Sequence, residues 1–354
     1  MSLYRLITAI AFFCLAQYAF ADINEAWQGF SDPDILSSGF THNYFALPRE
    51  GATSYTGPKY WSSDYWPSNQ GGINYRWHSP KPMGFNTYDF PLKELKRLPT
   101  RDLQSLAPSE KFDILMGRYD YPLKAEVGRS VSPRAQDWEG ICHGWVMAAL
   151  HHAEPKPKTF INADGVTVYF GSADIKALLT YYYAWHADGD TPTIGRRCSF
   201  GNWTGGRENC DQDLNAGAFH IVLANKLGLQ GTGFVMDVER MDEVWNQPII
   251  AYRSQFQGEF RPTQGAARSA VREFRITTQI WYVSESDNFW YPIQGTPNQQ
   301  FDTKVFQYRI ELNNRDEIVG GTWESTERPD FIWHKEKTRN FSGYFARLSE
   351  LLND

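Results

Sequence analysis

Apolar residues recur with a helical period in the middle of the chain. In residues 141–150 (ICHGWVMAAL), Ile141, Trp145, Ala148 and Ala149 fall at i, i+4, i+7 and i+8, so the pattern predicts a helix with one buried face. A face of this kind packs against the protein interior.

Two longer helices are predicted downstream. Ser172 is a favourable N-cap, and the apolar stripe after it predicts a helix over residues 172–183. Asp213 can cap a later helix that runs through residues 220–227, with Gly228 as its natural end. Short helices are expected at residues 92–98, 100–106 and 342–352.

The last third of the chain alternates apolar and polar residues. This period of two is typical of half-buried strands and predicts strands at residues 274–283 and 305–312. A turn at residues 313–317 leads into a further strand at 318–323, and shorter strands are predicted at 165–170 and 232–238. Residues 250–354 are therefore expected to be mostly β.

The N-terminus has the pattern of a secretory signal peptide. One basic residue, Arg5, precedes the apolar run of residues 6–15, and the sequence AFA ends at residue 21. This arrangement predicts a signal peptide over residues 1–21, because the run is too short and wrongly flanked for a membrane-spanning helix. The mature protein is expected to be secreted, extracellular or periplasmic, and not to span a membrane.

Composition divides the remaining chain at about residue 110. Residues 22–110 are rich in Tyr, Trp, Ser, Asn, Gly and Pro, which predicts irregular structure with short helices. This section is expected to be either a pro-region or an integral wrap over the core, and the sequence leaves both open. Residues 111–354 carry the strongest helical and strand patterns, so they are expected to form a core of the α+β class with a β-rich C-terminal part.

The charged residues exclude one class of partner. The net charge is −6, and the charges are interspersed without a basic block. Nucleic-acid binding is therefore not expected. Aromatic residues make up 16% of the chain, and core packing explains them better than sugar binding does.

The cysteines point to one free thiol. Without the signal peptide, three remain: Cys142, Cys198 and Cys210. In an oxidising compartment two of them should pair, and Cys198 and Cys210 flank a polar, glycine-rich loop. A bridge there would contribute about 3 kcal/mol. Cys142 is then the unpaired thiol, and a thiol kept free in such a compartment favours a catalytic cysteine over a buried core residue.

The position of Cys142 suits a nucleophile. It falls in the first turn of the helix over residues 141–150, where the helix dipole favours thiolate over thiol. A cysteine nucleophile needs a base and a group that orients the base. His220 and Asp237 are the candidates for these roles, although a histidine in an apolar run is often a core residue. Gln136, six residues before Cys142, is a candidate oxyanion donor.

Several short motifs resemble those of one family. These are residues 142–145 (CHGW), 218–225 (AFHIVLAN), 244–248 (VWNQP), 320–323 (GGTW) and 329–333 (PDFIW). Together they resemble the transglutaminase-elicitor family, which is best known from secreted cell-wall transglutaminases of oomycetes and is also found in bacteria. The VWNQP motif begins the hallmark elicitor peptide of that family.

The resemblance implies a papain/transglutaminase-like core and a two-step acyl transfer. The cysteine attacks the side-chain amide of a glutamine, releases ammonia and forms a thioester, which a lysine amine or water resolves. By position, Cys142 would be the nucleophile, His220 the base and Asp237 its orienting residue, with Gln136, Trp145 and Trp245 in oxyanion or substrate binding. Papain-like cores carry the base on a strand, whereas the pattern around His220 predicts a helix.

The resemblance also implies a cofactor and partners. Relatives are calcium-dependent, and the local calcium candidates are Asp188 and Asp190, although a solvated acidic loop explains these residues better. The expected function is that of a secreted, monomeric protein-glutamine γ-glutamyltransferase acting on glutamine and lysine side chains of cell-wall or host proteins. A secreted cysteine peptidase, a glutamine deamidase and a non-catalytic cell-surface or virulence binding protein on the same fold are the alternatives.

Overall fold

The structure is a computed structural model that describes residues 27, 29–53, 60–200, 208–209, 212–241, 243–338 and 340–352. The predicted signal peptide, residues 1–21, lies outside these residues. No helix within the described ranges is both long enough and apolar enough to cross a membrane.

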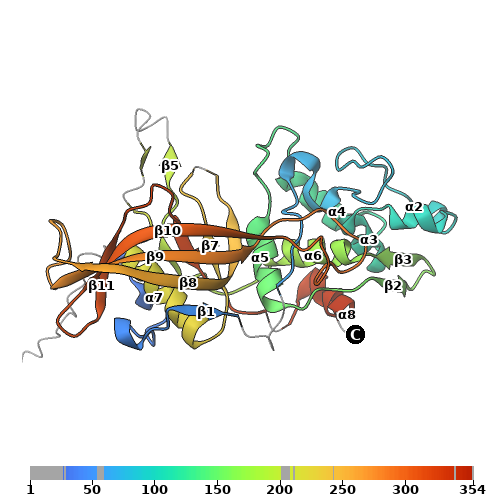
Figure 1. The fold of residues 1–354 in the computed structure, drawn as a ribbon. Helices are drawn as coiled ribbons and strands as arrows, with labels where there is room; N and C mark the ends of the chain where they lie inside the picture. The colour runs from blue at the N-terminus through green and yellow to red at the C-terminus, as the bar shows by residue number, and fades with distance from the viewer. Residues whose placement is uncertain are drawn as a thin grey trace, which may run out of the picture.

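Most helices lie at one end of an elongated molecule, and the main sheet lies at the other (Figure 1). The helices are α1 (Leu92–Leu95), α2 (Thr100–Gln104), α3 (Pro108–Leu115), α4 (Pro122–Ser130), α5 (Cys142–His151), α6 (Ser172–Trp185), α7 (Ala216–Leu223) and α8 (Leu348–Leu352). A π-helical turn, η6 (Ala224–Leu229), continues α7, and 3₁₀ turns include η3 (Ser68–Gln70), η4 (Gly72–Asn74) and η7 (Gly343–Arg347). The mixed helix and sheet fold, with strands concentrated in the C-terminal part, confirms the predicted α+β class.

The main sheet is antiparallel and contains eight strands. Its order is β11-β10-β9-β8-β7-β12-β4, and β1 pairs with β8 outside this path. The strands are β1 (Glu50–Ala52), β4 (Thr193–Gly195), β7 (Phe234–Asp237), β8 (Asn246–Phe260), β9 (Arg272–Val283), β10 (Phe301–Leu312), β11 (Ile318–Trp323) and β12 (Phe331–Trp333). Two small ribbons, β2 (Lys158–Ile161) with β3 (Thr167–Phe170) and β5 (Ser199–Phe200) with β6 (Glu208–Asn209), lie apart from it.

The two faces of the sheet belong to two hydrophobic cores. Side chains alternate between the faces of a strand, and on β7 Phe234 and Met236 join one core while Val235 joins the other. The core with Val235 contains α5 and α6, and the core with Phe234 contains α7. Helices α5 and α7 therefore pack on opposite faces of the sheet.

Helix α5 forms the junction between the helical end and the sheet. It contacts α6 on one side and β7 and β8 on the other, and its residues Gly144 to Leu150 are buried. Gly144 allows the close approach to α6, because a Cβ at this position would lie 2.0 Å from the carbonyl oxygen of Thr180. The start of α5 is thereby fixed relative to both layers.

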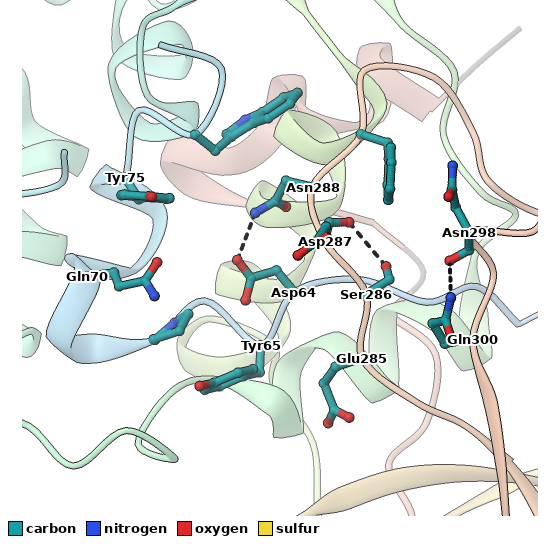
Figure 2. Close-up of a pocket in the computed structure, with 13 residues that line it drawn as sticks. Asp64, Tyr65, Gln70, Tyr75, Glu285, Ser286, Asp287, Asn288, Asn298 and Gln300 are labelled. Atoms are coloured by element: carbon teal, nitrogen blue, oxygen red, sulfur yellow. Dashed lines mark hydrogen bonds between the residues drawn. The ribbon is translucent and has the colours of Figure 1, made fainter. Parts of the chain in front are cut away.

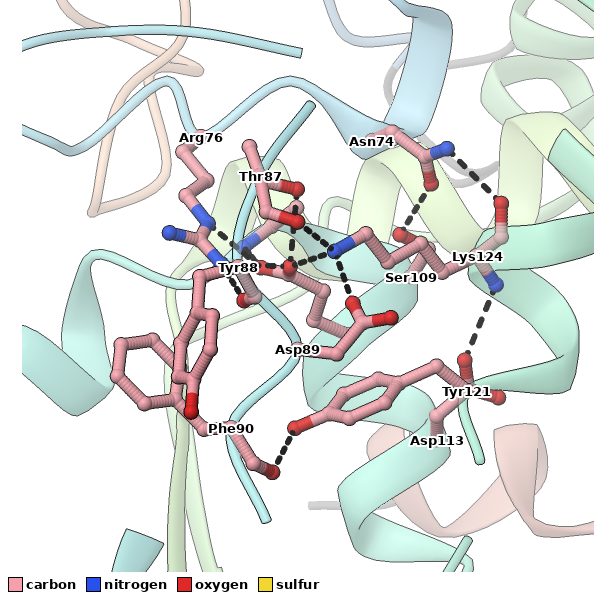
Figure 3. Close-up of polar contacts among 12 residues, drawn as sticks. Asn74, Arg76, Thr87, Tyr88, Asp89, Phe90, Ser109, Asp113, Tyr121 and Lys124 are labelled. Atoms are coloured by element: carbon pink, nitrogen blue, oxygen red, sulfur yellow. Dashed lines mark hydrogen bonds and ion pairs between the residues drawn. The ribbon is translucent and has the colours of Figure 1, made fainter. Parts of the chain in front are cut away.

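The N-terminal section packs against the rest of the chain. Strand β1 pairs with β8, and Trp61 and Trp66 are fully buried in the core that contains α5. The buried carboxylate of Glu110 on α3 pairs with Arg76 at 2.7 Å and with Lys124 on α4 at 2.8 Å (Figure 3). These contacts pack the section onto the core, while the choice between a pro-region and an integral wrap and the domain boundary at residue 110 stay predictions.

Most predicted elements are present. Helices α1, α2, α5 and α6, strands β3, β7, β9, β10 and β11, and the final turn and helix fall where the patterns predict them. The helix around His220 differs at both ends. Its N-cap is Asn215, whose side chain accepts the Gly217 N–H, and not Asp213, and the chain continues through Gly228 as η6. Strand β8 has no clear sequence signal, because Pro248 and the bulge at Gly258 interrupt the alternation.

The contact between α5 and α6 generates a stability prediction. Gly144→Ala adds a methyl group against backbone atoms that cannot move away, so we expect the free energy of unfolding to fall by about 1–3 kcal/mol. Gly128→Ala is the matched control, since it lies exposed in α4 with Asn74 at 3.8 Å as its nearest contact, and it should be neutral or slightly stabilising. Urea unfolding measures both, and equal effects would contradict the packing argument.

Candidate active site

Cys142 is the first residue of α5 and is held there by the N-terminal section. The backbone N–H of Ile141 donates to the carbonyl oxygen of Tyr65 at 2.8 Å. Gly140 permits this approach, since a Cβ there would lie 2.6 Å from the same oxygen. Cys142 is the free cysteine of the described ranges, and its side chain is 6% exposed. The predicted unpaired thiol therefore lies at a helix N-terminus, just below the protein surface.

The hairpin between β7 and β8 covers the thiol. The Sγ atom of Cys142 donates to the carbonyl oxygen of Val244 at 3.7 Å, and Nδ2 of Asn246 donates to Sγ at 3.8 Å. The amide of Asn246 is oriented from behind, because Nε1 of Trp333 donates to its Oδ1 at 2.7 Å. The VWNQP motif thus supplies the groups that face the sulfur atom.

Burial determines the protonation state of the thiol. It raises the pKa of Cys142 to about 11, although hydrogen bonds from the backbone and side chain of Asn246 lower it. The negative charges of Glu285 and Asp237 raise it further. The favourable helix N-terminus is therefore outweighed, and the thiol needs a proton acceptor before it can attack a carbonyl carbon.

Asp237 is one of two carboxyl groups, with Glu285, whose charge affects the Cys142 thiol. It is the last residue of β7, lies directly opposite Asn246 in the ladder and is fully buried. Its Oδ1 accepts the backbone N–H of Trp245 at 3.1 Å, and its Oδ2 has no hydrogen-bond partner within the described ranges. Burial and the charge of Asp330 raise its pKa well above the usual value, which makes it a stronger base than an ordinary carboxylate.

The structure does not bring His220 to Cys142. Its Nδ1 lies 2.8 Å from the hydroxyl oxygen of Tyr308, and its ring packs against Tyr44 and Tyr308. Helix α7, which carries it, lies on the opposite face of the sheet from α5. Burial lowers the pKa of His220 to about 4, so it stays neutral in the core. The expected Cys142–His220–Asp237 triad is therefore not assembled, and of the two predicted partners only Asp237 is close enough for its charge to affect the thiol.

The other predicted site residues have different environments. Trp145 is fully buried and donates from Nε1 to the Trp61 carbonyl oxygen at 3.0 Å, which assigns it to the core and not to substrate binding. The side chain of Gln136 is exposed on the loop before α5. Trp245 belongs to the segment that covers the thiol and is partly exposed. Its ring meets the ring of Tyr65 edge to face, with the ring centroids 5.5 Å apart.

Two cavities flank this region. The larger, of about 780 Å³, is lined by Asp64, Tyr65, Glu285, Asp287 and Asn288 among others (Figure 2). The smaller, of about 340 Å³, includes His143, Asn246, Trp333 and Lys335. Tyr65 and Glu285 line the larger cavity, and Asn246 lines the smaller one. Residues near the thiol therefore border both cavities.

The sequence patterns gave only weak signals for these residues. Asn246 is part of the VWNQP motif, which carries the resemblance without assigning it a role. Glu285 is an acidic residue two positions after the apolar strand β9, and Asp64 lies in a Trp- and Tyr-rich stretch of irregular chain. Neither position has a spacing that would associate it with Cys142.

The calcium and disulfide predictions stay untested. Asp188 and Asp190 are both exposed. Cys198 is buried, and Cys210 lies outside the described ranges, so the pairing of these two cysteines stays a prediction.

One group in the described ranges has potential metal-ligand atoms close together. The ligand atoms of Cys198, Asp213 and Asp330 lie within 4.8 Å of one another. Arg328 already pairs with Asp213 at 2.6 Å, and the backbone N–H of Cys198 donates to Asp330. These contacts explain the arrangement as a structural polar cluster.

Comparison with known proteins identifies the family. The family model described as transglutaminase elicitor matches residues 128–343, more than half of the chain, so this chain belongs to the transglutaminase elicitor family. This confirms the resemblance found in the sequence. Among solved structures, the GP42 transglutaminase from Phytophthora sojae has a similar fold, with a TM-score of 0.65 and 23% sequence identity over 88% of this chain and 93% of that chain. No curated protein sequence matches the chain significantly.

The environment of His220 generates a pH prediction. Its pKa is about 4 in the folded protein and about 6.5 in an unfolded chain, so between these values the unfolded chain binds more protons. The free energy of unfolding should therefore fall as the pH is lowered through this range, by up to about 3 kcal/mol. His220→Gln should remove this part of the pH dependence.

Urea unfolding at several pH values measures the effect. His42→Gln is the control, because His42 is a partly exposed histidine that pairs with Asp34 at 3.1 Å. Parallel pH profiles for the wild type and His220→Gln would contradict a neutral, buried His220.

Proposed function

We propose that this protein is a secreted protein-glutamine γ-glutamyltransferase in which Cys142 is the nucleophile. The observation that carries the proposal is a free thiol at the N-terminus of a buried helix, faced by the VWNQP segment of a transglutaminase elicitor family member. The signal-peptide pattern of residues 1–21 supports secretion.

Acylation begins with removal of the thiol proton. In this proposal Asp237 takes over the role first assigned to His220 and accepts the proton, since its free Oδ2 and raised pKa suit a base in a buried site. The thiolate attacks the side-chain carbonyl carbon of a glutamine, and the amide nitrogen leaves as ammonia with the proton that Asp237 returns. A thioester to Cys142 remains.

Asn246 is the proposed oxyanion donor in place of Gln136. Its Nδ2 already lies 3.8 Å from Sγ, and Trp333 fixes the amide orientation, so an oxygen developing on the attacked carbon would meet a pre-oriented N–H group. The backbone N–H groups at the start of α5 add further donors. The smaller cavity, which includes Asn246, is the proposed site of the glutamine side chain.

A lysine amine or water then resolves the thioester. Trp245 and Tyr65 pack against each other beside the covering segment, and this aromatic pair is proposed to limit access of water. The proposed partners are glutamine- and lysine-bearing proteins of a cell wall or host. Calcium dependence, with Asp188 and Asp190 as candidate ligands, and a monomeric state belong to the same proposal.

One observation favours a second function. Cys142 is 6% exposed and its pKa is raised to about 11, as expected for an inert core cysteine. A non-catalytic cell-surface binding protein on this fold is therefore the second candidate.

The catalytic assignment predicts the behaviour of three variants. The assay measures incorporation of a dansyl-labelled primary amine into casein, together with ammonia release, with and without calcium. Cys142→Ala should abolish both signals, and Asp237→Asn should reduce both about 100-fold or more, because it removes the proton acceptor. His220→Gln should keep most of the activity per folded molecule, because His220 lies across the sheet from the thiol.

The outcomes separate the candidate functions. Ammonia release without amine incorporation would define a deamidase. No signal from the wild type, with casein binding intact, would favour the binding protein. Loss of activity in folded His220→Gln, as judged by circular dichroism, would restore the original base assignment and contradict that of Asp237.

A further inference from the structure

We propose that the larger cavity beside Cys142 is the acyl-acceptor site, where the primary ammonium group of a lysine side chain binds and Glu285 accepts its proton. This inference rests on the proposed function and assigns the second substrate of that reaction to a place in the fold.

The cavity lies next to the nucleophile. Tyr65 and Glu285 both line it, and each is close enough to Cys142 for their charges to affect one another. The carbonyl oxygen of Tyr65 also accepts the N–H of Ile141, the residue before Cys142. A ligand in this cavity would therefore lie beside the first turn of α5, which carries Cys142.

The charge of the cavity selects a cation. Its lining includes the carboxyl groups of Asp64, Glu285 and Asp287, and no basic side chain contributes to it within the described ranges. The volume of about 780 Å³ is sufficient for an extended side chain. Tyr65, Tyr75 and Trp77 provide aromatic faces against which methylene groups and an ammonium group can pack.

An amide oxygen of the cavity lining lacks a hydrogen-bond donor. Nδ2 of Asn288 donates to Asp64 at 2.7 Å (Figure 2), and its buried Oδ1 has no partner among the described residues. Gln247, which lies behind the lining residue Glu285, is 3% exposed and donates from Nε2 to Glu285 at 2.8 Å. Because the Asp64 carboxyl group fixes the amide orientation, the free atom of Asn288 is an acceptor. A ligand that satisfies it must be a donor, and an ammonium group has three N–H bonds.

Glu285 has the properties of a proton acceptor for this amine. Burial raises its pKa, which brings its basicity closer to the working pH. The ammonium group gives one proton to Glu285, and the neutral amine attacks the thioester carbonyl carbon. The C–N bond forms, the C–S bond breaks, and the second nitrogen proton passes to the leaving thiolate. The products are an isopeptide bond, the Cys142 thiol and a protonated Glu285, which releases its proton to solvent.

The contacts of Asp64 favour an ammonium group over a calcium ion. Both of its oxygens already accept N–H groups, from Trp66 at 3.0 Å and from Asn288 at 2.7 Å. Calcium requires six to eight oxygen ligands. An ammonium group needs only about three acceptors, and the carboxylates and amide oxygens of the lining offer enough of them.

The test compares two acceptors of different charge. A labelled alkylamine is a cation at neutral pH, whereas hydroxylamine is largely uncharged and needs no carboxylate to deprotonate it. In Glu285→Gln we expect kcat/KM for the alkylamine to fall about tenfold or more, and that for hydroxylamine to fall much less.

Asp287→Asn, at an exposed position of the lining, should raise KM for the alkylamine and keeps the test valid if Glu285→Gln does not fold. Glu259→Gln, an exposed carboxylate near the far end of β8, is the matched control.

The outcomes are distinct from those that test the proposed function. If the wild type releases no ammonia from glutamine, the proposed function fails. If it releases ammonia but both lining variants treat the two acceptors equally, only the acceptor site is overturned. Calcium binding to the wild type and to Asp287→Asn is also measured by isothermal titration calorimetry. If the wild type binds calcium and Asp287→Asn does not, the cavity is a calcium site and the amine assignment is overturned.

Discussion

The structure around Cys142 depends on how the first turn of α5 is held. A hydrogen bond to the Tyr65 carbonyl oxygen fixes the turn from one side, and the hairpin of β7 and β8 closes over it from the other. The near contact between Gly144 and α6 fixes the helix along its length. Three segments that are far apart in the sequence therefore meet at a single polar atom, the sulfur of Cys142.

This enclosure explains the electrostatics of the site. The side chains are largely removed from water, so burial raises the pKa values of the thiol, Asp237 and Glu285. A carboxylate whose pKa is raised toward the working pH is a stronger base, which suits Asp237 and Glu285 to the proton transfers proposed for them. The same burial leaves acceptor atoms without donors, because no basic side chain lines the larger cavity within the described ranges.

The sheet separates chemistry from packing. One face of β7 and β8 carries Asp237 and Asn246 toward α5, and the other face carries apolar residues toward α7. His220 belongs to the second face, where its ring contacts tyrosines and its lowered pKa keeps it uncharged.

The sequence by itself determined the helices and most strands, because their periodicity of 3.6 or 2 records which side chains are buried. It also determined the free thiol at a helix N-terminus and the family. It could not determine which face of the sheet each residue occupies, since a strand such as β8, interrupted by Pro248 and Gly258, leaves no periodic signal. The tertiary structure alone decides this choice of face. It separates His220 from Cys142 and places Tyr65, Asn246 and Glu285 near the thiol. The physical reason is that cross-strand pairing and long-range packing bring together residues whose spacing along the chain carries no information about contact.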